Sequence, residues 1–239
     1  MTKLSFAKIR ARAAARKGSE EALQSLLLPV MPLERLAATP DDRVLSEMAK
    51  RIFSAGFAWT VIEKKWPGFE EAFLGFDPGR LVFEPDDFWD ARLSDKRIVR
   101  NGQKIMAIRR NAEFIGEIGE EHGSFGKFLA CWPATDQVGL WDLLGKRGAR
   151  LGGNTGRYFL RFIGKDSFMV TRDIALCLRD AGLEIAENPT SKRDLAKIQA
   201  QFDQWAEETG LPYTHLSRIC AMSIGENYSA ETLASYGED

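Results

Sequence analysis

The feature that most restricts the fold of this chain is a glycine-rich stretch, Trp141-Asp-Leu-Leu-Gly-Lys-Arg-Gly-Ala-Arg-Leu-Gly-Gly-Asn-Thr-Gly-Arg-Tyr-Phe-Leu160. It predicts two helices joined by a tight turn. The second helix should run from about Gly156, because Asn154 and Thr155 are good N-cap residues. Three glycines can take the positive φ values that such a turn needs: Gly148, Gly152 and Gly153. The stretch therefore predicts a helix, a hairpin turn and a second helix.

A turn of this kind can point backbone N–H groups outward beside a helix N-terminus, where they form a site for anions such as phosphate. Basic residues surround it: Lys146, Arg147, Arg150 and Arg157. The turn is thus a candidate grip for a nucleic-acid backbone. The alternative reading of these residues alone is a helix corner with solvated basic side chains, because glycine-rich corners are common.

Basic residues are unevenly distributed, although the formal net charge of the 239 residues is −1. Residues 1–18 contain no acid, and residues 91–110 and 142–172 hold far more basic than acidic side chains. Such segregation can build one basic face, which suits a polyanionic partner. The alternative is that the helices simply alternate their charged faces.

Other features argue against membranes, disulfides and metals. No apolar run reaches the ~18 residues of a membrane span, and no signal peptide is recognisable. The cysteines, few and far apart, fit reduced thiols in the cytosol. His122 and His215 have no cysteine at metal-ligand spacing. We therefore expect a cytoplasmic protein with no membrane partner, no metal and no cofactor.

The apolar spacing is helical throughout, and no segment alternates like a strand. We expect the helix that begins near Asp41 to continue or bend at 55–59, and short helical pieces to flank Pro67. Further helices are expected at 98–118, 125–132, 167–180, 190–208 and 214–223. The chain is predicted to be all-α, with two packed helical lobes.

Four segments in order resemble the DNA-3-methyladenine glycosylase I family. Ser54-Ala-Gly-Phe-Ala-Trp59 is similar to its Q-A-G-L-S-W motif, and Phe69-Glu-Glu-Ala-Phe-Leu-Gly-Phe-Asp-Pro78 to its F-x-x-F-D segment. Ile98-Val-Arg-Asn-Gly-Gln-Lys-Ile-Met-Ala-Ile-Arg-Arg-Asn-Ala112 resembles its I-I-R-N-x-x-K-I helix, and Lys146-Arg-Gly148 the start of its hairpin. The likeness covers roughly residues 41–183.

The resemblance implies a two-lobed, all-α fold of the helix-hairpin-helix DNA glycosylase type. Such enzymes flip a damaged base out of duplex DNA and excise it without a metal-activated nucleophile. The whole chain would be a single glycosylase-like unit, monomeric, with damaged double-stranded DNA as its partner. Residues 1–40 would be divergent N-terminal helices, 41–183 the family-like core and 184–239 C-terminal helices.

The resemblance also assigns roles to residues. Trp59 matches the tryptophan of the base pocket, where an aromatic face can stack on the flipped base. The residues that would hold the DNA backbone come from the basic helix and the hairpin: Arg100, Lys104, Arg147, Gly148, Gly152, Gly153, Asn154 and Arg157.

Two departures set this chain apart from the family. The family reads its base with a glutamate eight residues before the motif tryptophan, and Arg51 stands there. An arginine accepts no hydrogen bond and repels a cationic alkylpurine. The zinc ligands are also missing, because Val170-Thr-Arg-Asp173 replaces V-N-D-H and there is no N-terminal cysteine. We therefore expect no zinc.

Asp173 is the candidate catalytic acid, because the wider superfamily places an aspartate shortly after the hairpin helix. A carboxylate suits the oxocarbenium-like state in which an N-glycosidic bond breaks. Alignment on Val170 puts Thr171 at the superfamily position, however, and Asp173 could simply favour a helix start. Asp41, Asp42 and Glu47 are further acids in the family-like core.

The preferred hypothesis is a metal-independent DNA N-glycosylase of the 3-methyladenine type, acting in base excision repair. A second is a catalytically inactive helix-hairpin-helix protein that binds DNA or lesions, which the loss of the pocket glutamate favours. A third is a helical interaction protein with no role on nucleic acid.

Overall fold

The computed structural model describes residues 5–27 and 29–229, and the described part contains helices and no strand. The predicted all-α class is therefore confirmed. None of the helices in those residues is long and apolar enough to span a membrane. The chain forms two compact units, and each is built from separate stretches of sequence.

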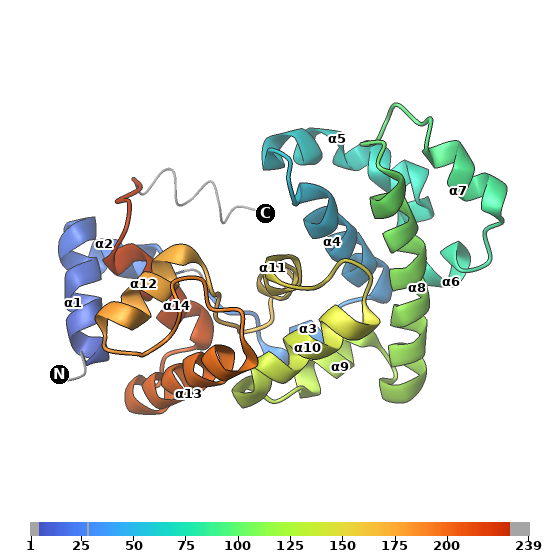
Figure 1. Cartoon of the computed structure of the whole chain (residues 1–239). Coiled ribbons are helices and arrows are strands. Elements are labelled where there is room, and N and C mark those ends of the chain that lie inside the picture. The colour runs from blue at the N-terminus through green and yellow to red at the C-terminus, as the bar shows by residue number, and fades with distance from the viewer. Residues whose placement is uncertain (1–4, 28, 230–239) are drawn as a thin grey trace. The chain divides into compact units, whose positions relative to one another are not determined.

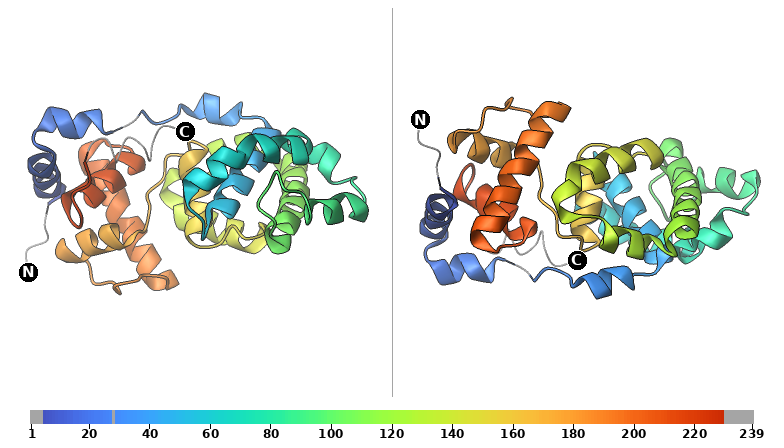
Figure 2. Two further views of the ribbon diagram at one scale, coloured as in Figure 1. Left: turned by 90° about the horizontal axis from the view of Figure 1, so that it is seen from above. Right: turned by 90° about the horizontal axis from the view of Figure 1, so that it is seen from below.

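The central unit comprises residues 31–133 and 139–165. Its helices, labelled in Figure 1, are α3 (Leu33–Ala37), α4 (Asp41–Ser54), α5 (Trp59–Ala72), η1 (Leu74–Phe76), α6 (Pro78–Leu81), α7 (Asp86–Arg92), α8 (Gly102–His122), α9 (Phe125–Cys131), α10 (Gln137–Arg147) and α11 (Asn154–Phe162). The long α8 stands between α4 on one side and α6 and α7 on the other (Figure 1), and Figure 2 shows the same unit from above and from below. Since α4 also contacts α5 and α11, it is the helix around which the others of this unit pack.

The terminal unit comprises residues 1–30, 134–138 and 166–239, described at 5–27, 29–30, 134–138 and 166–229. It contains the start of α10 and the helices α1 (Phe6–Lys17), α2 (Glu20–Ser25), η2 (Ala134–Asp136), α12 (Arg172–Asp180), α13 (Lys192–Thr209) and α14 (Tyr213–Ser223). Helix α1 packs along α14 (Figure 1). The predicted organisation into residues 1–40, 41–183 and 184–239 stays a prediction, and its ends lie partly outside the described residues.

Local signals in the sequence set several helix boundaries. The side chain of Asn101 accepts a hydrogen bond from the backbone N–H of Lys104 and caps α8. Ser124 caps α9 in the same way. The helix expected at 167–180 begins only at Arg172, because Thr171 is its N-cap.

The expectation of short helical pieces around Pro67 is wrong, since α5 runs through this proline from Trp59 to Ala72. A proline inside a helix removes one backbone hydrogen bond. Here the rings of Trp66, Phe69 and Phe76 stack on one another at centroid distances of 5.0 and 5.4 Å. The packing of large aromatic side chains outweighs the local preference for a break.

Candidate base pocket and hairpin

The predicted helix, turn and helix are present as α10, residues 148–153 and α11. Only Gly153 among the three predicted glycines has a positive φ, of 60°, and Arg150 has the same φ of 60°. Gly148 is required for a different reason: a Cβ there would lie 2.7 Å from the Leu144 carbonyl oxygen. Helix α11 begins at Asn154 rather than near Gly156, and its N-cap is Gly153, which has no side chain to cap with.

A buried asparagine of α8 holds the hairpin turn. The Asn111 amide nitrogen donates to the Ala149 carbonyl at 3.1 Å, and its Oδ1 accepts from the Ala149 N–H at 2.8 Å. Among the described residues, the backbone N–H groups of Gly152 and Gly153 donate to no partner. A hollow of about 300 Å³ lies beside the turn, lined by Ile52, Ala55, Arg150, Gly152 and Thr155. The turn thus presents free donors next to an open space.

Two of the four basic side chains predicted to hold DNA lie on the surface. Arg100 is exposed and makes no hydrogen bond or ion pair within the described part of the chain. Arg147 lies 3.1 Å from both Glu117 and Glu121, which raise the pKa of its guanidinium. An anion that binds Arg147 therefore competes with two carboxylates.

The other two basic side chains are buried. The ammonium of Lys104 donates to the carbonyls of Phe53 at 3.2 Å and Ala55 at 2.6 Å, so it closes the C-terminal end of α4. Burial, with Arg150 nearby, lowers the pKa of Lys104. Arg157 stacks on Trp141, and burial lowers its pKa to about 10. Both side chains are engaged inside the unit, so neither is placed to hold the DNA backbone.

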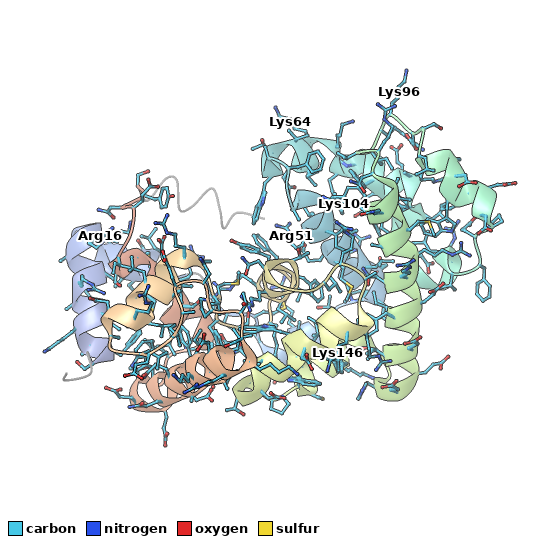
Figure 3. The ribbon with its side chains drawn as sticks, viewed as in Figure 1. Arg16, Arg51, Lys64, Lys96, Lys104 and Lys146 are labelled. Atoms are coloured by element: carbon cyan, nitrogen blue, oxygen red, sulfur yellow. The ribbon has the colours of Figure 1, made fainter. Side chains whose placement is uncertain are left out.

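Arg51 is buried in the last turn of α4, with 1% of its side chain exposed (Figure 3). Its Nε lies 2.6 Å from the Glu47 Oε1, one helical turn earlier. The guanidinium carbon is 3.9 Å from the ring centre of Phe162 and 5.0 Å from that of Trp59. None of the three guanidinium nitrogens makes a hydrogen bond of acceptable geometry to any described residue. The position of the family's base-reading acid thus holds a buried, under-satisfied cation.

Trp59 is the first residue of α5 and is partly exposed. Its ring meets those of Tyr158 and Phe162 edge-on, with both centroid distances at 5.4 Å. We call these three residues the aromatic cluster. Tyr158 and Phe162 come from the helix that follows the hairpin, so α11 links the turn to the base-pocket candidate. Neither Tyr158 nor Phe162 is predicted from the sequence, because nothing in their local pattern distinguishes them from core residues.

Glu47 has a strongly perturbed carboxyl group. Burial is the largest cause and raises its pKa to about 7, against the opposing effect of Arg51 and Lys50. Glu63 on α5 adds a like charge that acts in the same direction as burial. Glu47 and Arg51 were not paired from the sequence, although their spacing of four residues on one helix face is a signal that could have linked them.

The remaining candidate acids have structural partners. Asp41 accepts from the Phe125 N–H at 2.9 Å, and Asp42 contacts Arg43 at 3.1 Å. Asp173 belongs to the terminal unit, in the first turn of α12, where its carboxylate lies close against Gly225. The N-cap of that helix is Thr171. Among the described residues, no three His, Cys, Asp or Glu side chains are grouped so that they could hold a metal ion.

Comparison with known proteins gives a family match for part of the chain. Residues 37–139 match the family model described as methyladenine glycosylase. This range contains Arg51, Trp59 and α8 and ends before the hairpin. The resemblance expected from the four motifs is therefore confirmed.

Two solved structures with TM-scores above 0.5 share the fold at low sequence identity, and a third is similar over part of the chain. The 8-oxoguanine DNA glycosylase of Methanocaldococcus jannaschii is 14% identical, covers 89% of this chain and 92% of its own, and has a TM-score of 0.54. The same organism's 8-oxoguanine glycosylase/lyase, solved with a 15mer DNA containing 8-oxoguanine, is also 14% identical, with coverages of 90% and 95% and a TM-score of 0.51. The 3-methyladenine DNA glycosylase I of Staphylococcus aureus is 22% identical, with coverages of 77% and 99% and a TM-score of 0.49.

Proposed function

We propose that this chain, whose residues 37–139 match the methyladenine glycosylase family model, is a metal-independent DNA N-glycosylase acting in base excision repair. It removes a damaged base from duplex DNA and works as a monomer in the cytoplasm, without a cofactor. The observation that carries the proposal is the aromatic cluster, in which Trp59 of α5, at the position of the family's pocket tryptophan, contacts Tyr158 and Phe162 of α11, the helix that follows the hairpin.

The hairpin supplies the grip that base flipping requires. Extruding a nucleotide costs a few kcal/mol of unstacking, which contacts to the backbone must offset. The free N–H groups of Gly152 and Gly153 and the N-terminus of α11 suit a phosphate, and the hollow beside them has room for it. Arg100 and Arg147 add positive charge. Lys104 and Arg157 act from inside, by holding α4 and α11 in place.

The flipped base stacks on Trp59, and the bond from C1′ of the sugar to the base nitrogen then breaks. Water adds to C1′, so that the free base and an abasic deoxyribose are the products. A carboxylate that faces the oxocarbenium-like sugar stabilises its charge or activates the water. We assign this role to Asp173, as the acid that follows the hairpin helix in the sequence.

Base release from alkylated duplex DNA tests the proposal. Trp59→Ala should slow release at least tenfold, and Asp173→Asn by about 100-fold, in the range found when one transition-state contact is removed. If Asp173→Asn keeps full activity, another acid is responsible. If the wild type binds DNA but releases no base from several lesions, the chain is an inactive DNA- or lesion-binding protein. Arg51 at the position of the family's glutamate favours this second candidate.

DNA binding isolates the role of the hairpin. Gly152→Asp places a negative charge beside the free N–H groups and should weaken duplex binding at least tenfold. Gly116→Asp is the matched control, because Gly116 is exposed on α8 with open space around it. The logarithm of the wild-type affinity should fall linearly with the logarithm of the salt concentration, as contacts to phosphates require. If Gly152→Asp binds duplex DNA with unchanged affinity, the hairpin is only a helix corner and does not contact the DNA backbone.

A further inference from the structure

We propose that Arg51 reads the flipped base as a hydrogen-bond donor, and that the preferred base is a neutral 6-oxopurine with an unsubstituted N7 rather than a cationic alkyladenine. This inference rests on the proposed function and names its substrate class. It reverses the hydrogen-bond polarity of the family's base-reading position, where a glutamate accepts.

The first support is the unsatisfied state of the guanidinium. All three Arg51 nitrogens are hidden from solvent, and none makes a hydrogen bond of acceptable geometry to a described residue, although Nε lies 2.6 Å from Glu47. A buried donor without a partner destabilises the fold, and more so when it is charged. A ligand that supplies acceptors at this position removes that cost, whereas a purely structural arginine would be expected to have its donors satisfied within the fold.

The second support is the direction in which the donors remain open. Glu47 contacts Arg51 at Nε, on one edge of the guanidinium. Glu63 lies 4.0 Å from Nη2, beyond hydrogen-bonding distance. The two Nη nitrogens are therefore the ones left for a ligand, and they form a planar fork that matches two neighbouring acceptors.

The third support is the aromatic surroundings. The Phe162 ring, 3.9 Å from the guanidinium carbon, covers one face of the fork and holds its plane. The edge-on contact between Trp59 and Phe162 is not a stacked pair. A base that displaces this contact stacks on the indole and brings its edge to Arg51. The loop before Trp59 is exposed and contains Gly56 at a φ of 81°, so the start of α5 has room to adjust.

The chemistry of the base edge then selects the substrate. A 6-oxopurine presents O6 and N7 side by side as acceptors, the pair that arginine binds most often in DNA recognition. An adenine derivative presents N7 beside an N6 amino group, whose hydrogens would face the arginine donors. A positive charge on the alkylated base adds repulsion at a site that is largely desolvated.

The test compares hypoxanthine with 3-methyladenine. The substrates are a duplex that contains one hypoxanthine and a methylated duplex that contains 3-methyladenine. We expect the full-length wild-type protein to release hypoxanthine at least tenfold faster than 3-methyladenine. Arg51→Gln should remove this preference, with a loss of about ten- to 100-fold on hypoxanthine, as for one bidentate base contact. Arg51→Lys keeps the positive charge but lacks the planar fork, so its rate of hypoxanthine release should lie between those of the wild type and of Arg51→Gln. Equal or faster release of 3-methyladenine by the wild type would overturn the proposal.

A binding measurement separates this inference from the proposed function. If no lesion is released, the free bases hypoxanthine and 3-methyladenine are titrated against the protein and followed by tryptophan fluorescence. If the wild type binds hypoxanthine more tightly than 3-methyladenine and Arg51→Gln abolishes this difference, Arg51 reads the base even though the protein is not an active glycosylase. No preference, or one that Arg51→Gln leaves intact, refutes it.

Arg92→Gln is the matched control for substitution of a stacked arginine. Arg92 lies 3.5 Å from the Phe88 ring centre and donates to backbone carbonyls of the central unit. Arg92→Gln should leave the ratio of the release rates of hypoxanthine and 3-methyladenine unchanged. Thermal unfolding shows whether each Arg51 variant folds. If Arg51→Gln does not fold, Arg51→Lys is compared with the wild type in its place.

Discussion

At the scale of single residues, the pair formed by Glu47 and Arg51 carries most of the information about this site. Two opposite charges at 2.6 Å, with 18% of the Glu47 side chain and 1% of the Arg51 side chain exposed, are stabilised less than a well hydrogen-bonded pair. Removing one partner would leave the other charge buried. The pair is thus a poor device for stability alone and suits a site that awaits a ligand.

The raised pKa of Glu47 predicts a pH-dependent stability. Because its folded-state value of about 7 lies above the ordinary 4.5, the folded protein holds a proton that the unfolded chain releases. This stabilisation is complete below pH 4.5 and is lost as the pH rises through 7, by roughly 3 kcal/mol. In Glu47→Gln the free energy of unfolding, measured with urea from pH 5 to 8, should lose this decline.

Glu71→Gln serves as the control for that pH series, since 70% of the Glu71 side chain is exposed. It should keep the wild-type slope. A Glu47→Gln protein that still loses stability between pH 5 and 7 in the wild-type manner would show that another group titrates.

Lys104 gives a second prediction at this scale. Lys104→Met removes the donor from the Phe53 and Ala55 carbonyls at the end of α4 and leaves them without their partner. We expect a loss of about 1–3 kcal/mol in the free energy of unfolding. Lys64→Met, at an exposed position of α5, should change it by less than about 0.5 kcal/mol. Equal effects of the two substitutions would contradict the capping role.

At the scale of elements, the hairpin depends on close approach of backbones more than on unusual φ values. Gly148 faces the Leu144 carbonyl, Gly152 lies against Gly145, and Gly156 faces the Leu151 carbonyl. Gly148 and Gly156 let α10, the turn and α11 pack at distances that a side chain would prevent, whereas a Cβ at Gly152 would be in ordinary van der Waals contact. The same tight packing places α11 so that Tyr158 and Phe162 reach Trp59.

Gly156→Ala should therefore disrupt this element. Its Cβ would lie 2.2 Å from the Leu151 carbonyl oxygen, which forces the backbone to shift and should cost about 2–3 kcal/mol. Gly116→Ala, in open space on α8, should be neutral or stabilising by up to about 1 kcal/mol. Chemical denaturation of both variants checks this, and a Gly156→Ala protein as stable as Gly116→Ala would refute it.

At the scale of the whole molecule, the terminal unit joins distant parts of the sequence. Arg12 on α1 contacts Asp180 at 2.6 Å, and Arg16 donates to the carbonyls of Met222 and Gly225. Much of the charge in the basic first helix is thus used to hold α12 and the segment after α14. The uneven charge distribution seen in the sequence does not translate directly into a free basic surface.

Phe6 tests this organisation. Its ring is buried and lies 5.2 Å from that of Trp205 on α13, so Phe6→Ala should cost about 3–5 kcal/mol. Hydrogen exchange should accelerate in α1, α13 and α14 while α4 and α8 keep their protection. Phe83→Ala, at a ring that is 86% exposed, should alter neither set. Equal acceleration in α4 would contradict an independent terminal unit.

The sequence by itself determined the helical class, the capping residues Asn101 and Ser124, and the hairpin between two helices, because these depend on interactions within a few residues. It also marked Arg51 as a departure from the family pattern. Only the tertiary structure decided that Lys104 and Arg157 are buried, that Phe162 covers Arg51, and that α5 continues through Pro67. These outcomes depend on contacts between residues far apart in the chain, whose energies local spacing does not contain.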